Sequence, residues 1–251
     1  MTDRRLLLRA WLLAMTRLEI QLRADQARAR NAMIRQAAKA YLNNGHPPTH
    51  VFVAHRTRVK GVIEQHYRRT IPVFAGMALK QVKSRRIEKK TAQTIHEWLT
   101  ARWIEREALR KATMIADTDR DDVLGAIETG ITDGLGTAEI ARNIRQVSSL
   151  TPYRASVVAR TETHAAATYG SIEGVREAER TLGVTMRKEW LPTQDARTRP
   201  DHLAMAGSDP IAMDEKFIVG GEAMDRPGDT SASAAQTVNC RCAIIFEEKA
   251  E

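Results

Sequence analysis

Residues able to ligate a metal ion gather in the last quarter of this 251-residue chain. The stretch QDARTRPDH supplies Asp195 and His202, and the stretch NCRC supplies Cys240 and Cys242. Zinc in proteins is bound by about four ligands of these types in a tetrahedral array. The four side chains are therefore candidate zinc ligands, and zinc is the cofactor that the sequence suggests, provided that the fold brings the two stretches together.

Two other interpretations of the same residues stay open. A cysteine thiolate near His202 and several arginines would have a lowered pKa and could act as a nucleophile, although no third group that would orient the histidine is identifiable. In the structural interpretation, which we favour, Asp195 and the arginines form a buried ion-pair network, the cysteines are small buried hydrophobes, and no cofactor is needed. The residues of this predicted clasp are Asp195, Arg197, Thr198, Arg199, His202, Asn239, Cys240, Arg241 and Cys242.

The two cysteines also indicate a reducing compartment. They are separated by one residue and have no other partner in the chain, so a disulfide between them would be strained. Near the start, the apolar stretch LLLRAWLLAM is interrupted by Arg9, and no apolar run approaches the roughly 18 residues of a membrane span. We therefore expect a soluble protein that does not contact a membrane.

Charge is distributed unevenly along the chain. The first 100 residues carry 20 Lys and Arg against 6 Asp and Glu, whereas the remainder carries 19 against 25. An excess of positive charge attracts polyanions or acidic protein surfaces, although a solvated helical face is an equally good interpretation. The candidate residues for contact with DNA or an acidic partner are Arg9, Arg23, Arg30, Lys83, Arg85, Arg86, Lys89 and Lys90.

The first half of the chain has the hydrophobic periodicity of long helices. Residues 3–42 contain no Gly or Pro, and Trp11, Met15 and Leu18 fall on one stripe, which predicts a single amphipathic helix. Further helices are predicted over residues 51–69, punctuated by Pro72, and over residues 84–116. The acidic cluster of Asp117, Asp119 and Asp121 lacks the glycine of a calcium loop and is expected to cap the start of the next helix.

The second half changes from helix to strand. A helix over residues 152–182 is expected to end at Gly183, and alternating residues 184–190 then predict a strand. Thr198 is expected to cap a brief helix that carries His202. Residues 220–236 are expected to form an exposed loop, and residues 239–248 a final strand.

These elements predict an α+β protein. Long N-terminal helices, as a bundle or an extended arm, would precede a compact C-terminal domain with helices and a small antiparallel sheet. We place a basic helical region at residues 1–115 and the second domain at residues 116–251.

The order of motifs in the second half resembles the C-terminal signature of the Mu protein F-like minor head proteins of tailed bacteriophages, the phage head morphogenesis family. The resemblance covers about residues 115–247. Its elements are the Arg160-Thr161-Glu162 helix, Trp190, Asp195, Arg197, Thr198, Arg199, His202, Gly207, Phe217, the Pro227-Gly228-Asp229 turn, and Asn239-Cys240-Arg241-Cys242.

The resemblance implies a minor structural component of the phage head, associated with the portal and needed for head assembly or for DNA handling during packaging and ejection. The implied partners are the portal protein and other head proteins, with double-stranded DNA as a further candidate. The implied locations are the virion and, during assembly, the host cytoplasm.

The alternative is an enzyme built on the C-terminal polar cluster, either ADP-ribosyltransferase-like or a metal or thiol hydrolase. The family's C-terminal region has been compared with ADP-ribosyltransferase folds. The sequence has no S-T-S strand paired with an E-x-E motif, as a transferase would require. We therefore expect a structural protein rather than an enzyme.

Overall fold

The computed structural model describes residues 4–83, 87–147 and 152–249, and the chain forms two compact units. Unit 1 comprises residues 1–20, 66–103 and 157–251, and unit 2 comprises residues 21–65 and 104–156. Each unit therefore combines segments from both sides of residue 115, where the sequence placed the boundary between two domains. The reason is that single long helices contribute one part to each unit.

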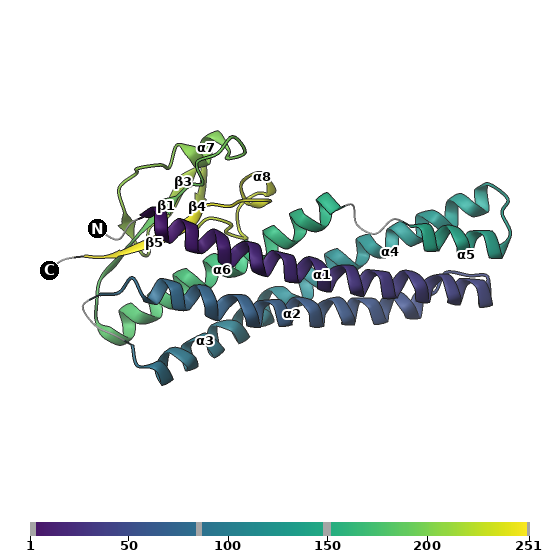
Figure 1. Ribbon diagram of the computed structural model, residues 1–251, viewed down its shortest axis with the longest axis horizontal. Helices are drawn as coiled ribbons and strands as arrows, with labels where there is room; N and C mark the ends of the chain where they lie inside the picture. Colours follow the sequence, from purple (N-terminus) through teal and green to yellow (C-terminus); the bar gives the residue numbers. More distant parts are fainter. Residues whose placement is uncertain (1–3, 84–86, 148–151, 250–251) are drawn as a thin grey trace. The chain divides into compact units, whose positions relative to one another are not determined.

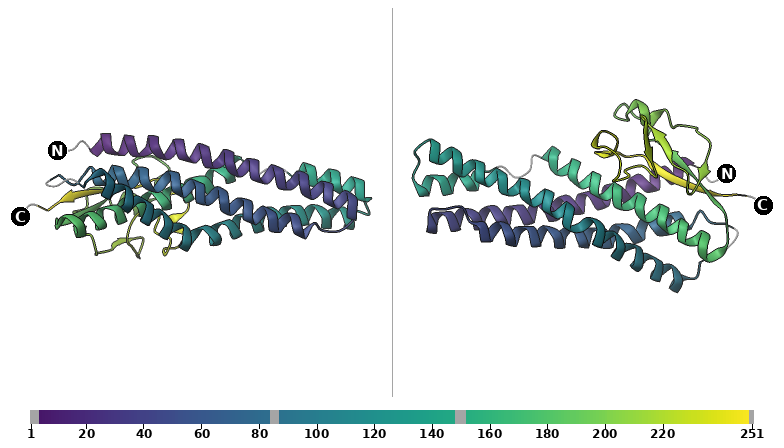
Figure 2. Two further views of the ribbon diagram at one scale, coloured as in Figure 1. Left: turned by 90° about the horizontal axis from the view of Figure 1, so that it is seen from below. Right: turned by 180° about the vertical axis from the view of Figure 1, so that it is seen from behind.

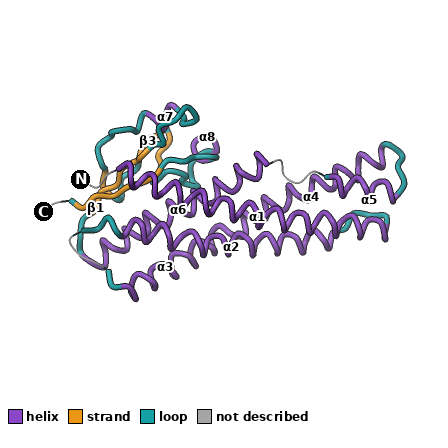
Figure 3. Tube along the Cα trace, viewed as in Figure 1, coloured by secondary structure: helices purple, strands orange, loops and turns teal. Residues whose placement is uncertain are grey.

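The chain is an α+β protein, as predicted (Figure 3). The helices are α1 (Arg4–Asn44), α2 (Thr49–Leu79), α3 (Lys89–Trp103), the π-helical turn η1 (Ile104–Ala108), α4 (Leu109–Thr132), α5 (Thr137–Gln146), α6 (Pro152–Leu182), α7 (Pro200–Leu203) and α8 (Ala234–Thr237). The strands are β1 (Met186–Leu191), β2 (Ile211–Ala212), β3 (Phe217–Val219), β4 (Glu222–Met224) and β5 (Ala243–Glu248). Within the described residues, no helix has both the length and the apolar composition needed to cross a membrane.

The long first helix is confirmed, whereas the predicted end of the second helix is wrong. Pro72 lies inside α2, which continues to Leu79. A proline inside a helix removes one backbone hydrogen bond and usually kinks or ends the helix. Here Phe74, Ala75 and Ala78 are buried directly after it, and this burial offsets the local cost.

The predicted third helix over residues 84–116 is also different in the structure. Residues 84–86 lie outside the described residues, and α3 begins at Lys89. The π-helical turn η1 separates α3 from α4, so the predicted single helix is two helices joined by a change of helical pitch.

Unit 2 is a helical unit with one apolar core. Gly45, at φ 68°, begins the short connection between α1 and α2, whose adjoining parts run antiparallel (Figures 1 and 2). The α4–α5 turn similarly has Gly134 at φ 68°. The buried core residues come from α1, α2, α4 and α5 and are Met33, Ile34, Ala37, Ala38, Tyr41, Val51, Phe52, Val123, Ile127, Ile140 and Ile144.

The predicted capping role of the acidic cluster is wrong, because Asp117, Asp119 and Asp121 lie in the middle of α4. Asp119 is buried and accepts hydrogen bonds from Arg30 on α1 and from His55 Nε2 on α2, the latter at 2.9 Å. Arg30 was a candidate DNA or portal contact. Its guanidinium is instead buried in this ion pair, so it cannot reach a surface ligand.

Unit 1 builds its sheet on α6. Strand β1 lies between β2 and β5 and is antiparallel to both, with Trp190 opposite Ile244. Strands β3 and β4 form a separate hairpin through Gly220 and Gly221, at φ 57° and 80°. The core between α6 and the strands includes Ile172, Val175, Ala178, Met186, Trp190, Phe217, Val219, Met224, Ile244 and Phe246.

Part of residues 220–236 contradicts the prediction of an exposed loop. The segment from Arg226 to Asp229 is buried. Asp229 accepts backbone hydrogen bonds from Asp225 at 2.9 Å and from Ser231 at 3.0 Å. The small polar residues therefore form an internal turn whose donors are satisfied by the aspartate, rather than a solvated loop.

Close packing between α2 and α6 depends on a glycine, and this yields a prediction. A Cβ atom added at Gly170 would lie 2.8 Å from the backbone oxygen of Ile71. We expect Gly170→Ala to lower the free energy of unfolding by about 1–3 kcal/mol, because the two helices must separate. The matched control is Gly61→Ala in α2, where an added Cβ meets nothing within 4 Å. This substitution should raise the free energy of unfolding by about 0.5–1 kcal/mol. Urea unfolding curves of both variants would measure the difference. Equal stability changes would contradict the assigned helix contact.

Candidate functional site

Three of the four predicted metal ligands meet in unit 1. His202 is carried by α7, and the two cysteines lie in the segment that leads into β5. His202 Nδ1 is 3.5 Å from the Cys240 sulfur and 3.3 Å from the Cys242 sulfur. All three side chains are buried, and both cysteines are free thiols. The fold therefore brings the stretches QDARTRPDH and NCRC together, which is the condition that the candidate site required.

The imidazole of His202 is held on its other side by a glutamine. His202 Nε2 lies 2.9 Å from the Gln236 side-chain oxygen, and the Gln236 amide donates to Asp201 at 3.1 Å. This hydrogen bond places the ring proton on Nε2 and leaves the Nδ1 lone pair facing the sulfurs. The ring also packs edge-on against Trp190, with centroids 5.3 Å apart. Gln236 was missed by sequence reasoning because it lies in the segment predicted to be an exposed loop.

The two thiols differ in acidity. A hydrogen bond from Cys240, followed by the proximity of His202, lowers the pKa of Cys242 to about 4 despite its burial. The pKa of Cys240 is raised well above its usual value by the same hydrogen bond and by burial. The two thiols therefore titrate as one coupled pair. Cys242 is nevertheless buried, which limits access of a substrate to this sulfur.

Asp195 is not part of the cysteine cluster, so its assignment as a metal ligand is wrong. Its carboxylate forms a two-pronged ion pair with Arg241, with one contact of 2.6 Å. It also accepts the backbone N–H of Arg197 at 2.9 Å. Arg241 and Cys242 are neighbours on an extended segment, so their side chains point to opposite sides and only the cysteine reaches His202.

The clasp residues form a hydrogen-bonded network. The Asp195–Arg241 ion pair is partly exposed, however, whereas the sequence predicted a buried one. The side chain of Asp195 is 34% exposed, that of Arg241 16%, and that of Arg197 77%. Arg199 donates to the backbone oxygen of Val238 at 2.6 Å. Thr198 donates to the backbone oxygen of Thr193 instead of capping α7. The network ties the loop before α7 to the segment before β5.

Helix α6 contributes to the same network through its Arg-Thr-Glu motif. Arg160 donates to the Asn239 side-chain oxygen at 2.6 Å, and Thr161 accepts the Asn239 backbone N–H at 3.0 Å. Asn239 adopts φ 61°, a left-handed conformation that asparagine tolerates better than most residues. Glu162 points elsewhere and accepts a hydrogen bond from Tyr67 at 2.9 Å. The motif residues that were far apart in sequence therefore share one folded unit.

His164 adds a further contact that the sequence did not reveal. Its Nε2–H donates a hydrogen bond to the backbone oxygen of Cys242 at 2.7 Å. Burial lowers the pKa of His164, which keeps the ring neutral. A Cβ atom at Gly228 would lie 2.4 Å from His164 Nδ1, so the Pro-Gly-Asp turn needs its glycine to pass the ring.

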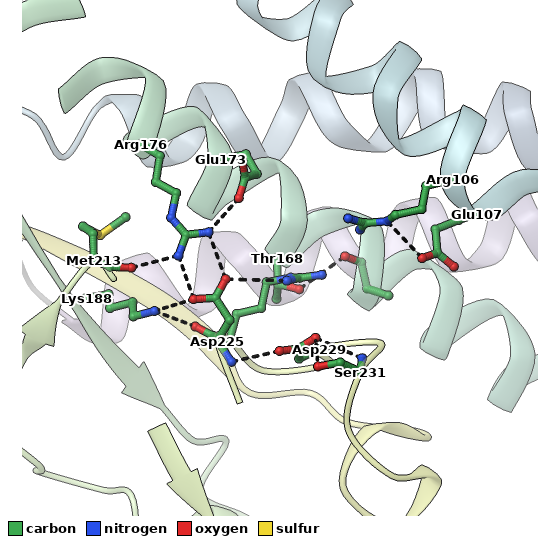
Figure 4. Close-up of polar contacts among 12 residues, drawn as sticks. Arg106, Glu107, Thr168, Glu173, Arg176, Lys188, Met213, Asp225, Asp229 and Ser231 are labelled. Atoms are coloured by element: carbon green, nitrogen blue, oxygen red, sulfur yellow. Dashed lines mark hydrogen bonds and ion pairs between the residues drawn. The ribbon is translucent and has the colours of Figure 1, made fainter. Parts of the chain in front are cut away.

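A second polar cluster in unit 1 was also missed. The ammonium group of Lys188 on β1 is fully buried and contacts the Asp225 carboxylate at 2.7 Å (Figure 4). Arg176 on α6 donates to the same carboxylate at 2.8 and 3.0 Å. The alternating pattern of β1 places Lys188 on the same face as Met186 and Trp190, so its inward direction was readable, but its partner was not.

The Asp195–Arg241 pair predicts a loss of stability in acid. The hydrogen bond from Arg241 is the main reason why the pKa of Asp195 lies well below its usual range. Its stabilisation is therefore present above the unfolded-state pKa of about 3.9 and is lost as the pH falls below it. We expect Asp195→Asn to cost about 1 kcal/mol near neutral pH and progressively less in acid. Thermal unfolding at a series of pH values, with exposed Asp209→Asn as control, would measure this. A difference that does not depend on pH would contradict it.

The fold and the clasp define an α+β protein whose C-terminal signature residues form one connected network. Residues 121–245 match the family model described as Phage Mu protein F like protein. The C-terminal half of the chain therefore belongs to the Mu F-like head morphogenesis family.

Two curated relatives each match about half of the chain. The chain is 34% identical over 124 residues to NAD(+)-arginine ADP-ribosyltransferase EFV of Enterococcus faecalis, a match that covers 49% of this chain and 25% of that protein. It is 33% identical over 128 residues to Minor head protein GP7 of Bacillus phage SPP1, covering 50% of this chain and 40% of that protein. The chain thus spans about a quarter of the length of the first relative and about two fifths of the length of the second. No solved structure gives a significant match.

Proposed function

We propose that this chain is a minor head protein of a tailed bacteriophage that takes part in head assembly. The observation that carries the proposal is the match of residues 121–245 to the Mu F-like family, together with the similarity to Minor head protein GP7. The physical support is that the signature residues join separate segments of unit 1. Asp195 pairs with Arg241, and His202 lies against Cys240 and Cys242. Asn239 is bonded to Arg160 and Thr161 of α6. A network of this kind stabilises a folded unit without needing a substrate.

The finer parts of the proposal concern partners. We propose contact with the portal protein and other head proteins, and location in the virion after assembly in the host cytoplasm. Arg9, Lys83, Lys89 and Lys90 of unit 1 and Arg23 of unit 2 are exposed, which supports contact with DNA phosphates or with an acidic portal surface. Arg85 and Arg86 lie outside the described residues.

The similarity to an ADP-ribosyltransferase is the observation that favours an enzyme. The matched segment is only a quarter of that protein, so the match does not assign the transferase activity to the shared part. The buried thiols and the missing S-T-S strand further favour a structural role. We therefore propose that the chain does not act as an enzyme.

The test is to locate the chain in phage particles. We expect a tagged chain, expressed by the phage or prophage that encodes it, to sediment with density-gradient-purified proheads or virions. We also expect it to co-purify with the portal protein of the same phage, whereas a tagged host enzyme in the same lysate should do neither. Absence from every particle fraction, together with transfer of ADP-ribose from NAD to arginine by the purified chain, would overturn the proposal.

DNA contact is tested separately by the salt dependence of binding. Replacing Lys83, Lys89 and Lys90 with alanine should weaken binding of the full chain to duplex DNA and reduce its salt slope by about one unit per lost phosphate contact. Changing Lys60 and Arg120 to alanine provides the control, because both pair with acids on their own helices. An unchanged slope would favour an acidic protein surface as the partner of the three lysines.

A further inference from the structure

Three metal-ligating atoms converge in a buried part of unit 1. The ligand atoms of His202, Cys240 and Cys242 all lie within 4.8 Å of one another. Among the residues that the structure describes, no other group of three or more His, Cys, Asp or Glu meets this condition. Two thiols and an imidazole nitrogen are ligands that zinc prefers, whereas calcium and magnesium prefer oxygen.

The separations between these atoms fit a tetrahedral metal centre. Zinc–sulfur bonds of about 2.3 Å and zinc–nitrogen bonds of about 2.0 Å, at a tetrahedral angle, place a sulfur and a nitrogen about 3.5 Å apart. The measured distances from His202 Nδ1 are 3.5 Å to Cys240 and 3.3 Å to Cys242. An ion could therefore enter with little movement of the side chains.

The surroundings of His202 are those of a metal-bound histidine. Ligating histidines almost always donate their second ring N–H to an oxygen acceptor, which fixes the tautomer and directs the free lone pair at the metal. His202 Nε2 has this partner in Gln236, which is itself held by Asp201. The one lone pair of Nδ1 faces two sulfurs, although it can accept only one good S–H hydrogen bond. A shared ion would satisfy all three groups.

We propose that His202 Nδ1 and the sulfurs of Cys240 and Cys242 bind one Zn²⁺ ion. Binding displaces the protons of both thiols to solvent and forms two zinc–sulfur bonds and one zinc–nitrogen bond. Two thiolates and a neutral imidazole exactly offset the charge of the ion, so the buried centre is neutral, whereas a lone buried thiolate would be costly. These three side chains leave a fourth coordination position, which Asp195 does not fill because it is held by Arg241.

The ion links two segments of unit 1, a role that goes beyond the proposed place in the phage head. It joins α7 to the segment that leads into β5. In sequence, His202 is 38 residues from Cys240 and 40 residues from Cys242. The clasp of Asp195 and Arg241 joins the same segments from the solvent side. Zinc therefore holds the buried side of the connection, and the ion pair holds the exposed side.

The experiment measures metal in the full chain, purified without an affinity metal or chelator. Elemental analysis and native mass spectrometry should find about one zinc per chain. Replacement by Co²⁺ should produce a sulfur-to-cobalt charge-transfer band, and a chelator should lower the melting temperature and expose both thiols to a thiol reagent. These measurements use the unaltered protein, so they do not depend on whether a variant folds.

Variants then identify the ligands. Cys240→Ser, Cys242→Ser and His202→Ala should each lose the zinc and the cobalt band, whereas Asp195→Ala should keep both. Gln236→Ala removes only the support of the histidine and should weaken zinc affinity by about 10–100-fold. Wild-type protein that stays free of metal after refolding with Zn²⁺ would overturn the proposal. Zinc that survives all three ligand substitutions would overturn it as well.

Discussion

Replacing Asp225 with alanine is expected to lower the free energy of unfolding by about 3–5 kcal/mol, because it leaves a buried lysine without its counter-charge. Lys188 has no exposed side-chain surface, and Asp225 is the acid that it contacts, at 2.7 Å. Burial lowers the pKa of Lys188, while the hydrogen bonds from Arg176 and Lys188 outweigh burial and lower the pKa of Asp225. Arg176 keeps a second acid, Glu173, at 2.7 Å, so the lysine is the group most affected (Figure 4).

Urea unfolding of the full chain would measure this effect, with two variants that separate charge from packing. Adding Lys188→Met to Asp225→Ala removes the stranded charge and should recover more than half of the lost stability. Exposed Asp209→Ala, on the loop after α7, should change the unfolding free energy by less than about 0.5 kcal/mol. If the double variant is as unstable as Asp225→Ala alone, the loss does not come from the uncompensated charge of Lys188.

Replacing Asp119 with alanine is expected to destabilise unit 2 by about 3 kcal/mol, because Arg30 and His55 both lose a buried acceptor. Arg30 retains its contact with Asp122 at 2.9 Å, and this partly exposed carboxylate compensates in part. Because the affected groups come from α1, α2 and α4, the loss should spread through unit 2 rather than stay local.

Hydrogen exchange read by mass spectrometry would locate this loss. Faster exchange is expected in peptides from residues 21–65, 104–147 and 152–156, the described part of unit 2. The matched control is Asp121→Ala on the same helix, where the side chain is 61% exposed and pairs with Arg120, so that the expected cost is about 0–1 kcal/mol. Equal exchange in the two variants would contradict the assigned role of the Arg30–Asp119 pair.

Local pattern was sufficient for much of the fold. The apolar stripe of α1, the helix that ends before Gly183 and the alternation of β1 each depend on neighbours a few residues apart, and all three are confirmed. Pro72 is the counterexample. Proline tends to end a helix, which is why the sequence predicted an end there, but burial of the helical residues beyond Pro72 outweighs this preference.

For the candidate site, the types and order of the residues were enough to select most of its members. The three-dimensional arrangement decided which of them contact one another. The sequence by itself offered His202, Cys240 and Cys242, together with Asp195, as candidate ligands and placed them in the Mu F-like motif. Only the tertiary structure separated Asp195 from the cysteines, buried Arg30 against Asp119, and supplied Gln236 and Asp225 as partners. The physical reason is that residue type fixes which bonds a side chain can form. Which partner it meets depends on contacts between residues far apart in the chain, and those exist only after folding.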